Sequence, residues 1–224
     1  MPAKTEKRAK YVQYQYNQSV MDNKKRMLEG KIYDCGDPSI AEEQTKTWDL
    51  MFEYNHTLPS QLEKRRELLG KMLGKCGKNC YIEAPFYANF GGRHLFVGDY
   101  FYANFHLTAV DDGNIYIGDH VMIAPNVTLA TATYPILSEL RVKNYQFNKD
   151  IHIGNNVWIG AGAIVLPGVT IGDDTVIGAG SVVTKDIPSG VVAFGNPCRV
   201  MRKVNEHDRE YFYKQEKIDW ENLD

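Results

Sequence analysis

Residues 153–184, IGNNVWIGAGAIVLPGVTIGDDTVIGAGSVVT, contain a six-residue repeat that decides the fold. A short apolar residue, most often followed by Gly or another small residue, returns every six positions from Ile153 to Val183, and an earlier block with the same spacing starts at Ile117. Ordinary strands alternate with a period of two and helices with a period of three to four, so neither explains this spacing. An inward aliphatic residue suits a strand, and the residues that follow suit a turn. The sequence therefore predicts a parallel β-helix in which three such units make one coil.

Turn-forming residues follow the inward residue at one constant offset. The predicted turns are Asn155–Asn156, Ala161–Gly162, Pro167–Gly168, Asp173–Asp174 and Ala179–Gly180. Residues 131–150 interrupt the repeat, yet its phase resumes after a whole number of units. This segment is therefore expected to loop out of a coil without disturbing it, and protruding loops on rigid repeats commonly hold binding and catalytic groups.

Composition restricts the partners and the location of the chain. Its 224 residues are 43% hydrophobic, which suits one repeat domain and a smaller cap, and the formal net charge is −2. This charge gives no electrostatic reason to expect a nucleic acid or an anionic membrane as a partner. No run of 18 apolar residues occurs, and the N-terminal MPAKTEKRAK lacks the apolar core of a signal peptide. A cytoplasmic protein is expected.

The cysteines are best interpreted as reduced structural thiols. Cys76 and Cys80 are spaced like a pair of metal ligands, but no second pair or histidine cluster follows them, and Cys35 and Cys198 stand far away. No metal site is expected.

The chain divides into four predicted parts. Residues 1–21 form a basic and then Tyr/Gln-rich extension that is predicted to be disordered, and residues 22–78 form a helical cap. The β-helix is predicted for 79–197, and residues 198–224 form a C-terminal segment with a short helix.

Two capping boxes are predicted inside the helical cap. Ser39 with Glu42 and Ser60 with Glu63 each have the spacing in which a hydroxyl and a carboxylate satisfy the first backbone N–H groups of a helix. The second helix has an apolar stripe that is predicted to be its packing face, formed by Leu62, Leu69, Met72 and Leu73.

Several segments together resemble the maltose and galactoside O-acetyltransferases. They are GKIYD at 30–34, IAPNVTL at 123–129, IGNNVWIG at 153–160, GAGSVVTKDIP at 178–188 and GNPCRV at 195–200. The resemblance covers about residues 22–205 and includes the cap as well as the repeats. It implies a mainly β fold, a left-handed parallel β-helix, assembled as a homotrimer with active sites between subunits. It also implies acetyl-CoA as the donor and a sugar hydroxyl of maltose, glucose or galactoside type as the acceptor.

The resemblance implies four acceptor-binding residues. Asn104 and Asp112 match such positions, where an amide and a carboxylate can hydrogen-bond sugar hydroxyls. Asn89 matches a third position across a one-residue insertion between Pro85 and Gly98. Asp34 matches the acceptor-side aspartate of the cap, although a shift of one residue would place Cys35 there. For Asn89, Asn104 and Asp112 the alternative is turn chemistry alone.

The resemblance also implies a set of coenzyme A contacts: Ala161, Ala179, Thr184, Lys185, Arg199 and Arg202. Backbone groups at the two alanines would bind the pantetheine arm, and the three cations would meet phosphates. Without the resemblance these cations would be interpreted as solvated surface charges.

One residue departs from the family pattern at the catalytic position. The family's general base is a histidine directly before the loop proline, where this chain has Tyr134 before Pro135. An imidazole with a pKa near 6.5 suits proton removal at neutral pH, whereas ionising a phenol with a pKa near 10 first would cost about 5 kcal/mol. Impaired catalysis is therefore expected. His106 is an alternative base, because two residues beyond Asn104 in a regular strand it would point to the same side.

Three classes of function follow from these observations. The first is an acetyl-CoA-dependent sugar O-acetyltransferase that is either fully active or impaired by Tyr134. The second is a non-catalytic or weakly catalytic relative that binds a sugar or coenzyme A. The third, a γ-class carbonic anhydrase, shares the hexapeptide fold but needs three histidines around zinc, and His106, His120 and His152 are spaced differently from that pattern.

Overall fold

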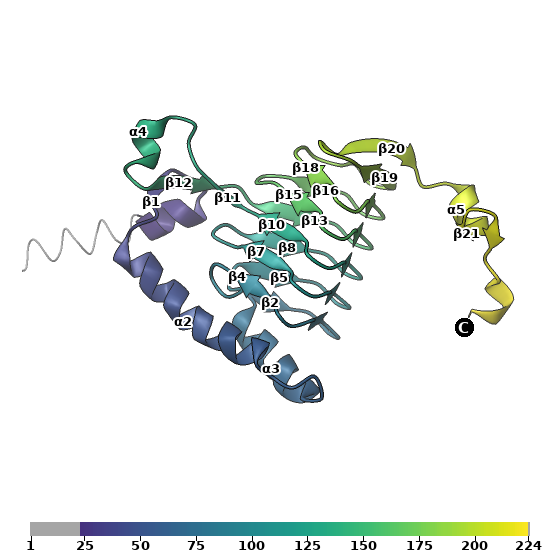
Figure 1. The fold of residues 1–224 in the computed structure, drawn as a ribbon, viewed down its shortest axis with the longest axis horizontal. Helices are drawn as coiled ribbons and strands as arrows, with labels where there is room; N and C mark the ends of the chain where they lie inside the picture. Colours follow the sequence, from purple (N-terminus) through teal and green to yellow (C-terminus); the bar gives the residue numbers. More distant parts are fainter. Residues whose placement is uncertain (1–22, 224) are drawn as a thin grey trace, which may run out of the picture.

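Three sheets, parallel except for one terminal strand, form the faces of a triangular prism in the computed structural model, which describes residues 23–223 (Figure 1). The first sheet contains β2 (Lys75–Cys76), β5 (Leu95–Val97), β8 (Ile115–Ile117), β13 (Ile151–Ile153) and β16 (Thr170–Ile171). The second contains β3 (Tyr81–Ile82), β6 (Tyr102–Ala103), β9 (Met122–Ile123), β14 (Trp158–Ile159), β17 (Val176–Ile177), β19 (Val191–Phe194) and β20 (Arg199–Lys203). The third contains β4 (Tyr87–Ala88), β7 (Thr108–Val110), β10 (Thr128–Ala130), β15 (Ile164–Val165) and β18 (Val182–Val183). The predicted β-helix is confirmed, and the arrangement is consistent with the left-handed form. The extension predicted for residues 1–21 lies outside the described residues.

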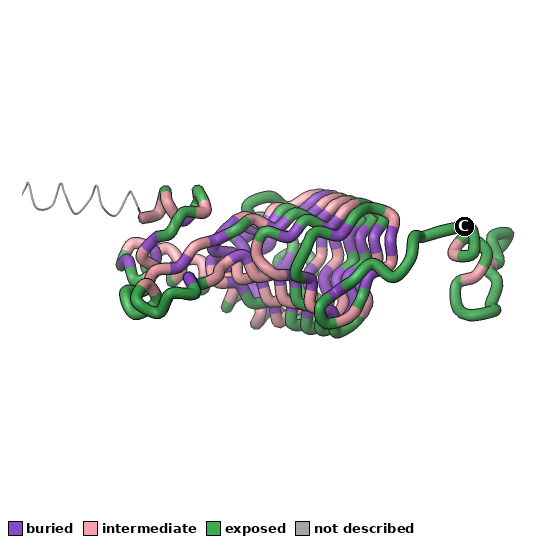
Figure 2. The backbone as a smooth tube through the Cα atoms, turned by 90° about the horizontal axis from the view of Figure 1, so that it is seen from above, coloured by how far each residue is buried: buried purple, intermediate pink, exposed green. Residues whose placement is uncertain are grey.

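The inward residues of the repeat form the core of the prism. Ile159, Val165 and Ile177 are fully buried, and Ile153 and Ile171 are nearly so. Buried positions recur at regular intervals along the backbone (Figure 2). Each buried aliphatic side chain stabilises the fold by roughly 1.5–3 kcal/mol relative to an exposed one, so the stack of coils is held together mainly by this repeated burial.

The predicted turns have the backbone that their residues favour. The second residue of each turn lies in the left-handed region, with φ of 55° at Asn156, 69° at Gly162, 82° at Gly168, 55° at Asp174 and 68° at Gly180. Gly, Asn and Asp adopt this conformation more readily than Val or Ile do. The turn prediction is therefore confirmed at all five positions.

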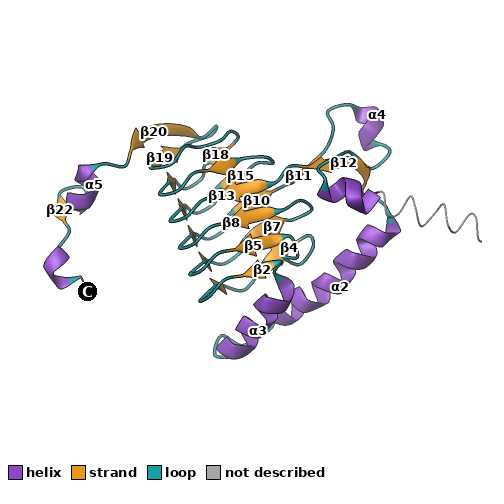
Figure 3. Ribbon diagram, turned by 180° about the vertical axis from the view of Figure 1, so that it is seen from behind, coloured by secondary structure: helices purple, strands orange, loops and turns teal. Residues whose placement is uncertain are grey.

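Two helices close one end of the prism (Figure 3). They are α2 (Pro38–Asn55) and α3 (Leu62–Met72). Tyr54, Leu69, Met72 and Leu73 belong to the same buried cluster as the inward residues of the coils, so the cap extends the core of the prism. Leu62, however, is 54% exposed, and its place in the predicted packing stripe was wrong because it lies at the solvent-facing start of α3.

Neither predicted capping box is present. The cap residue of α2 is Asp37, whose Oδ1 accepts from the backbone N–H of Ser39 at 2.9 Å, so Ser39 is a partner of the cap. Pro38 occupies the first turn, where a missing N–H costs nothing. Helix α3 begins after Gln61 with no side-chain cap, so Ser60 does not cap it.

The other end of the prism is closed by an antiparallel strand. β20 runs back along β19 and covers the edge of the last coil. The predicted short helix is α5 (Glu206–Glu210), and it is followed by β21 (Tyr211–Tyr213), β22 (Glu216–Lys217) and η1 (Trp220–Asn222). This segment extends away from the prism (Figure 1).

The inserted segment leaves the prism without changing its register. β8 pairs directly with β13, as the phase of the repeat predicts, while β11 (Ala132–Thr133), α4 (Ser138–Arg141) and β12 (Tyr145–Asn148) project outward. β12 pairs with β11 and also with β1 (Tyr33–Asp34), so the N-terminal strand and the loop form one small antiparallel sheet. No helix among residues 23–223 has the length and apolar character needed to cross a membrane.

Candidate active site

The predicted acceptor residue Asp112 lies at the centre of a polar cluster beside the inserted loop. It follows β7 and is 5% exposed. Asn89, which follows β4, donates from Nδ2 to Oδ2 of Asp112 at 2.7 Å, and Gln146 of β12 donates from Nε2 to Oδ1 at 3.0 Å. Two neutral amides thus hold both carboxylate oxygens. Since each oxygen has a further lone pair, the group can still accept a hydrogen bond from a ligand hydroxyl.

Gln146 also connects Asp112 to the N-terminal strand. Its amide nitrogen donates to the hydroxyl of Tyr33, which lies 3.5 Å from Oδ1 of Asn148. Burial, together with the nearby charge of Asp112, raises the pKa of Tyr33 far above its ordinary value. Tyr33 is therefore a neutral structural group that joins β1 to β12.

Tyr134 follows β11 at the start of the protruding loop and is 52% exposed. Cys35 is one of the neighbours that influence its hydroxyl. Partial burial, the Cys35 thiol and the charge of Asp112 raise the pKa of Tyr134 above that of a free phenol. Tyr134 therefore remains protonated near neutral pH, and the phenolate that could accept a proton is less populated here than in an ordinary tyrosine.

Cys35 also has a raised pKa. Partial burial is the main cause, and the neighbouring Tyr134 side chain offsets part of it. Neither Cys35 nor Tyr134 is thus ionised near neutral pH. Beside the Asp112 carboxylate, the cluster presents one neutral phenol and one neutral thiol.

The predicted Asp34 lies next to this cluster, whereas Asn104 does not. Asp34 belongs to β1, and its Oδ1 accepts from the backbone N–H of Gly36 at 2.9 Å. Of the two residues that the sequence left open at this position, Cys35 is the one that raises the pKa of Tyr134. Asn104 follows β6, at the other end of the face that contains β7, and its Oδ1 accepts from the N–H of Phe105 at 2.7 Å.

The expectation that His106 shares a strand with Asn104 was wrong. Strand β6 ends at Ala103, and His106 lies in the following turn with φ of 61°. Its ring lies against Tyr87, with 6.5 Å between the ring centroids. The short strand and left-handed turn break the alternation on which the expectation depended.

The predicted donor residues lie on the later coils. Ala161 and Ala179 occupy the same corner on neighbouring coils, since the N–H of Gly180 donates to the carbonyl of Ala161 at 2.8 Å. Thr184 and Lys185 follow β18. All four residues are exposed. The corner with Ala161 and Ala179 joins the second and third sheets, as does the turn that contains Asn104, whereas Thr184 and Lys185 lie at the corner between the third and first sheets.

Arg199 and Arg202 belong to the exposed strand β20. Arg202 forms a bidentate pair with Asp208, with both N–O distances at 2.7 Å, and this contact lowers the pKa of Asp208 to about 2. Arg199 donates to the carbonyl of Cys198 at 2.9 Å. Arg202 therefore has to share its guanidinium between Asp208 and any bound phosphate.

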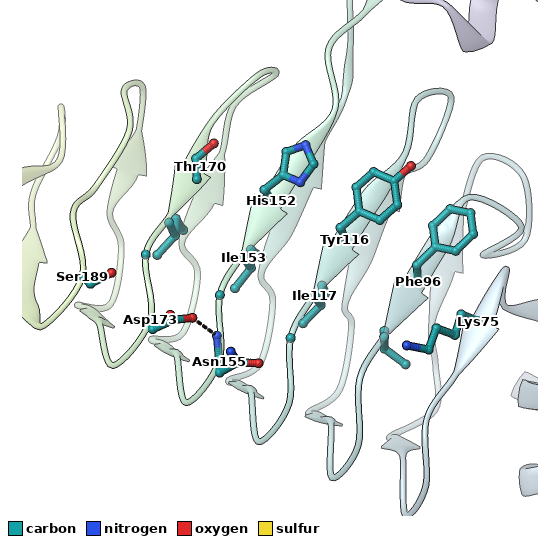
Figure 4. A pocket seen from close by; sticks show the side chains of 15 residues that line it. Lys75, Phe96, Tyr116, Ile117, His152, Ile153, Asn155, Thr170, Asp173 and Ser189 are labelled. Atoms are coloured by element: carbon teal, nitrogen blue, oxygen red, sulfur yellow. Dashed lines mark hydrogen bonds between the residues drawn. The ribbon is translucent and has the colours of Figure 1, made fainter.

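A separate groove of about 570 Å³ lies on the outer face of the first sheet (Figure 4). Phe96, Tyr116 and His152 stand there on successive coils, with ring centroids 5.1 and 5.0 Å apart. None of the predicted site residues lines it. It is therefore distinct from the cluster around Asp112.

The cysteines are free thiols in the described part of the chain. The Cys80 thiol donates to the carbonyl of Gly98 at 3.0 Å, and burial raises the pKa of Cys76 to about 12. These contacts agree with the structural interpretation. Between residues 23 and 223, no three His, Cys, Asp or Glu side chains are grouped so that they could hold a metal ion.

Comparisons with known proteins agree with this architecture. Residues 26–77 match the maltose acetyltransferase hexapeptide capping motif, and residues 150–185 match the bacterial transferase hexapeptide family with six repeats. A galactoside O-acetyltransferase of Lactococcus lactis is 49% identical over 89% of this chain and 96% of its own length. The chain belongs to the maltose and galactoside O-acetyltransferase family. The predicted resemblance is thus confirmed over most of the sequence.

Solved structures extend the match to three dimensions. A galactoside acetyltransferase in complex with coenzyme A has a TM-score of 0.85 and 46% identity, over 88% of this chain and 98% of its own. A maltose O-acetyltransferase from Clostridium difficile has a TM-score of 0.80 and 44% identity, over 82% of this chain and 97% of its own. Family membership favours an acetyltransferase over the carbonic anhydrase alternative.

Three residues of the cluster were given no role by the sequence, although Tyr33 stands in the GKIYD segment. Tyr33 and Gln146 meet only because β1 pairs with β12, two segments more than one hundred residues apart, and Asn148 adds a third contact from β12. Neither strand belongs to the repeat, so spacing could not find them. Cys35 was found only as the neighbour of the expected aspartate.

Proposed function

We propose that this chain transfers an acetyl group from acetyl-CoA to a sugar hydroxyl, slowly, because Tyr134 occupies the position of the family's general base. The observation that supports it most is the polar cluster. Asn89 and Asp112 are residue types that hold sugar hydroxyls, and the loop places Tyr134 close enough to Asp112 for its charge to act on the phenol. Close relatives named galactoside O-acetyltransferase, one of them solved with coenzyme A, support the donor and the acceptor class.

The acceptor would be held at the Asp112 end of the third sheet. Asp112 would accept a hydrogen bond from one hydroxyl, and Asn89 would keep the carboxylate in place. Asp34 or Cys35 would line the opposite wall, beside Tyr134. Maltose, glucose and galactosides have similar hydroxyls, so these side chains would orient the sugar ring without distinguishing among the three. The surrounding surface would determine which sugar is preferred.

The donor would lie along the corner that Ala161 and Ala179 share. Exposed backbone groups at these positions can bind the amides of the pantetheine arm, since a small side chain leaves them accessible. Thr184, Lys185, Arg199 and Arg202 would meet the phosphates, through hydrogen bonds that are roughly twice as strong as neutral ones. Arg202 would contribute least of the cations, because Asp208 already binds it on both nitrogens.

A homotrimer would bring the two halves of the site together. Asn104 and the donor alanines share one corner of the prism, while Asp112 and Tyr134 lie at another. A single chain therefore leaves Asn104 apart from the other proposed acceptor residues. If the corner of one subunit packs beside the loop of the next, Asn104 of one chain faces Asp112 of its neighbour.

The chemical step needs a proton acceptor as the sugar oxygen attacks the thioester carbonyl. The new C–O bond forms, the C–S bond breaks, and the hydroxyl proton must leave while coenzyme A departs as a thiol. A positioned base contributes about 10²–10⁴-fold to such steps, and protonated Tyr134 cannot supply this contribution. Alignment of the two substrates still accelerates the reaction. We place the reaction in the cytoplasm, the location expected from the sequence.

Thiol release from acetyl-CoA in the presence of maltose, glucose and a galactoside tests this proposal. Slow release that depends on the sugar, together with acetylated sugar identified by mass spectrometry, is expected. Release that does not depend on any sugar, with coenzyme A binding intact, would instead favour a non-catalytic binding relative. Absence of binding by calorimetry for both coenzyme A and sugars would contradict both alternatives.

A further inference from the structure

An aromatic cleft of about 630 Å³ lies between helix α2 and the first coil of the prism. Trp48, Phe52 and His56 line it from α2 and from the residue after this helix, and Pro85 and Tyr87 line it from the coil. Trp48 is 45% exposed, Phe52 66% and Tyr87 48%. Large aromatic side chains gathered at such exposure on one concave surface indicate a binding site.

The cleft adjoins the polar cluster through Trp48. The indole N–H of Trp48 donates to the backbone carbonyl of Asn89 at 2.9 Å, and the side chain of the same Asn89 donates to Asp112 at 2.7 Å. One residue thus separates the tryptophan from the carboxylate proposed to bind the acceptor. Neither Asn89 nor Asp112 lines the cleft itself, so a ligand bound at Asp112 would have to pass Asn89 to reach the aromatic surface.

The chemistry of the cleft fits a neutral, ring-shaped ligand with both polar and apolar surfaces. Among the described residues that line it, Asp49 is the one acid, and no Lys or Arg is present. The negative face of an aromatic ring attracts the weakly positive C–H groups of a hexose, while Asp49 and His56 can meet hydroxyls at the rim. A volume of this size falls within the range of small-molecule sites.

We propose that this cleft is a subsite for a second sugar ring, so that the preferred acceptor is an oligosaccharide. The inference rests on the proposed function for the acetyl transfer itself, and on the cleft for the preference for an acceptor with more than one sugar ring. The reacting ring would lie at Asp112, and the next ring would stack on Trp48. Trp48 would then determine specificity for chain length without taking part in the chemical step.

The dependence of kcat/KM on acceptor length shows whether Trp48 binds a second sugar ring or has a structural role only. For the wild-type enzyme, kcat/KM is expected to be higher for maltotriose than for glucose. Trp48→Ala also removes the hydrogen bond to the Asn89 carbonyl, so it should lower kcat/KM for maltotriose by about three- to tenfold more than it lowers the value for glucose, the usual worth of an aromatic contact. Trp220→Ala, which removes an exposed tryptophan of the C-terminal segment, is the matched control and should change neither value.

Binding measured without turnover keeps the test independent of catalysis. In a Trp158→Phe, Trp220→Phe background, Trp48 is the one remaining tryptophan, and maltotriose should change its fluorescence far more than glucose does. A maltotriose response without any acetylation would overturn the proposed function and support the cleft as a sugar site. Acetylation with equal kcat/KM for the two sugars, or equal losses for both in Trp48→Ala, would overturn the subsite and leave the proposed function standing. No fluorescence response to maltotriose would also overturn the subsite.

Discussion

The neighbours of Tyr134 make its phenolate form even rarer at neutral pH than in a free tyrosine. A free phenol already titrates about 3.5 units above imidazole, and here partial burial, the Cys35 thiol and the Asp112 carboxylate all act in the same direction on its pKa. A lysine or arginine beside the hydroxyl would have lowered this pKa, but the named neighbours are a thiol and an anion. The site is therefore built around a neutral phenol, which can donate a hydrogen bond.

Tyr134→His is expected to raise kcat by about 10²–10⁴-fold, because it supplies a base that is neutral and ready to accept a proton at pH 7. KM for acetyl-CoA should hardly change, since the proposed donor contacts lie on other coils. Thiol release with a saturating sugar measures both constants. If wild-type turnover is already high and the substitution changes nothing, another base acts. His106→Asn is the variant that would identify it.

The pH dependence of kcat follows from the raised pKa of Tyr134. If the phenolate is the active form, kcat of the wild-type enzyme should rise about tenfold per pH unit from pH 7 through pH 10, because the pKa lies above its ordinary value of about 10. Tyr134→His should instead level off above about pH 7, once the imidazole is neutral. Initial rates corrected for spontaneous thioester hydrolysis provide the comparison. A plateau near neutral pH in the wild-type profile would contradict a role for the phenolate.

Arg199 tests the proposed donor surface. Arg199→Ala should weaken coenzyme A binding by about tenfold, in line with the loss of a charge-assisted contact to phosphate, and leave the melting temperature nearly unchanged because the residue is exposed. Calorimetric titration measures the affinity. Arg66→Ala removes the same charge from the exposed side of α3 and should leave the affinity unchanged. Equal affinities for the two variants would mean that Arg199 is only a surface charge.

At the scale of elements, the repeat was readable from the sequence because every coil imposes the same local demands. Gly160 illustrates this, since a Cβ added there would lie 2.5 Å from the backbone nitrogen of Ala179 on the next coil. Strand β1 was not readable, because two residues pairing with a distant loop leave no period to detect. The same reason hid Gln146, whereas Tyr134 stood beside a recognisable proline. Sequence alone thus predicts the scaffold well and the cluster only in part.

The N-terminal capping residues of α2 and α3 test whether the structure or the sequence pattern identifies the caps correctly. Asp37→Ala should destabilise the protein by about 1 kcal/mol, since the cap of α2 loses its acceptor, and lower the melting temperature by about 2–4 °C. Ser60→Ala should have no measurable effect, although the sequence pattern marks Ser60 as a cap, because α3 has no side-chain cap. Thermal unfolding followed by circular dichroism compares the two. Equal shifts would contradict this assignment of the caps.

The stability that Asp37 contributes is also expected to depend on pH. Burial opposes ionisation of its carboxyl, but hydrogen bonds from Asn23 and Ser39 outweigh it, and the pKa is lower than in a free aspartate. A lowered pKa means that the native state favours the charged form. The cap therefore stabilises the protein above the unfolded pKa of about 3.9, and this stability is lost as the pH falls through the lower native value. The difference in melting temperature between wild type and Asp37→Ala should accordingly shrink towards pH 2.

At the scale of the whole molecule, Asn104 and Asp112 lie apart, so a site that uses both residues has to form between two subunits. Both residues flank β7, at opposite ends of one face of the prism, and the cluster around Asp112 includes no hydrogen bond to Asn104 among the described residues. A site built from both needs two copies of the chain. The homotrimer that the family resemblance implies would provide them, so light scattering should give a mass of about three times the 25.5 kDa of one chain.

Mixed assemblies test whether the site is shared, beyond the mass itself. In the more active Tyr134→His background, Asn104→Ala and Asp112→Ala should each be nearly inactive as pure proteins. When the two variants are refolded together in equal amounts, an interface is intact only where a chain with native Asn104 faces a neighbour with native Asp112. Random assembly produces this pairing at about a quarter of the interfaces, so about a quarter of the parent activity should return. If both pure variants are inactive and mixing restores nothing while light scattering shows that trimers have formed, Asn104 and Asp112 act within one chain and the shared site is wrong. An active pure Asn104→Ala protein would show instead that Asn104 has no part in the site.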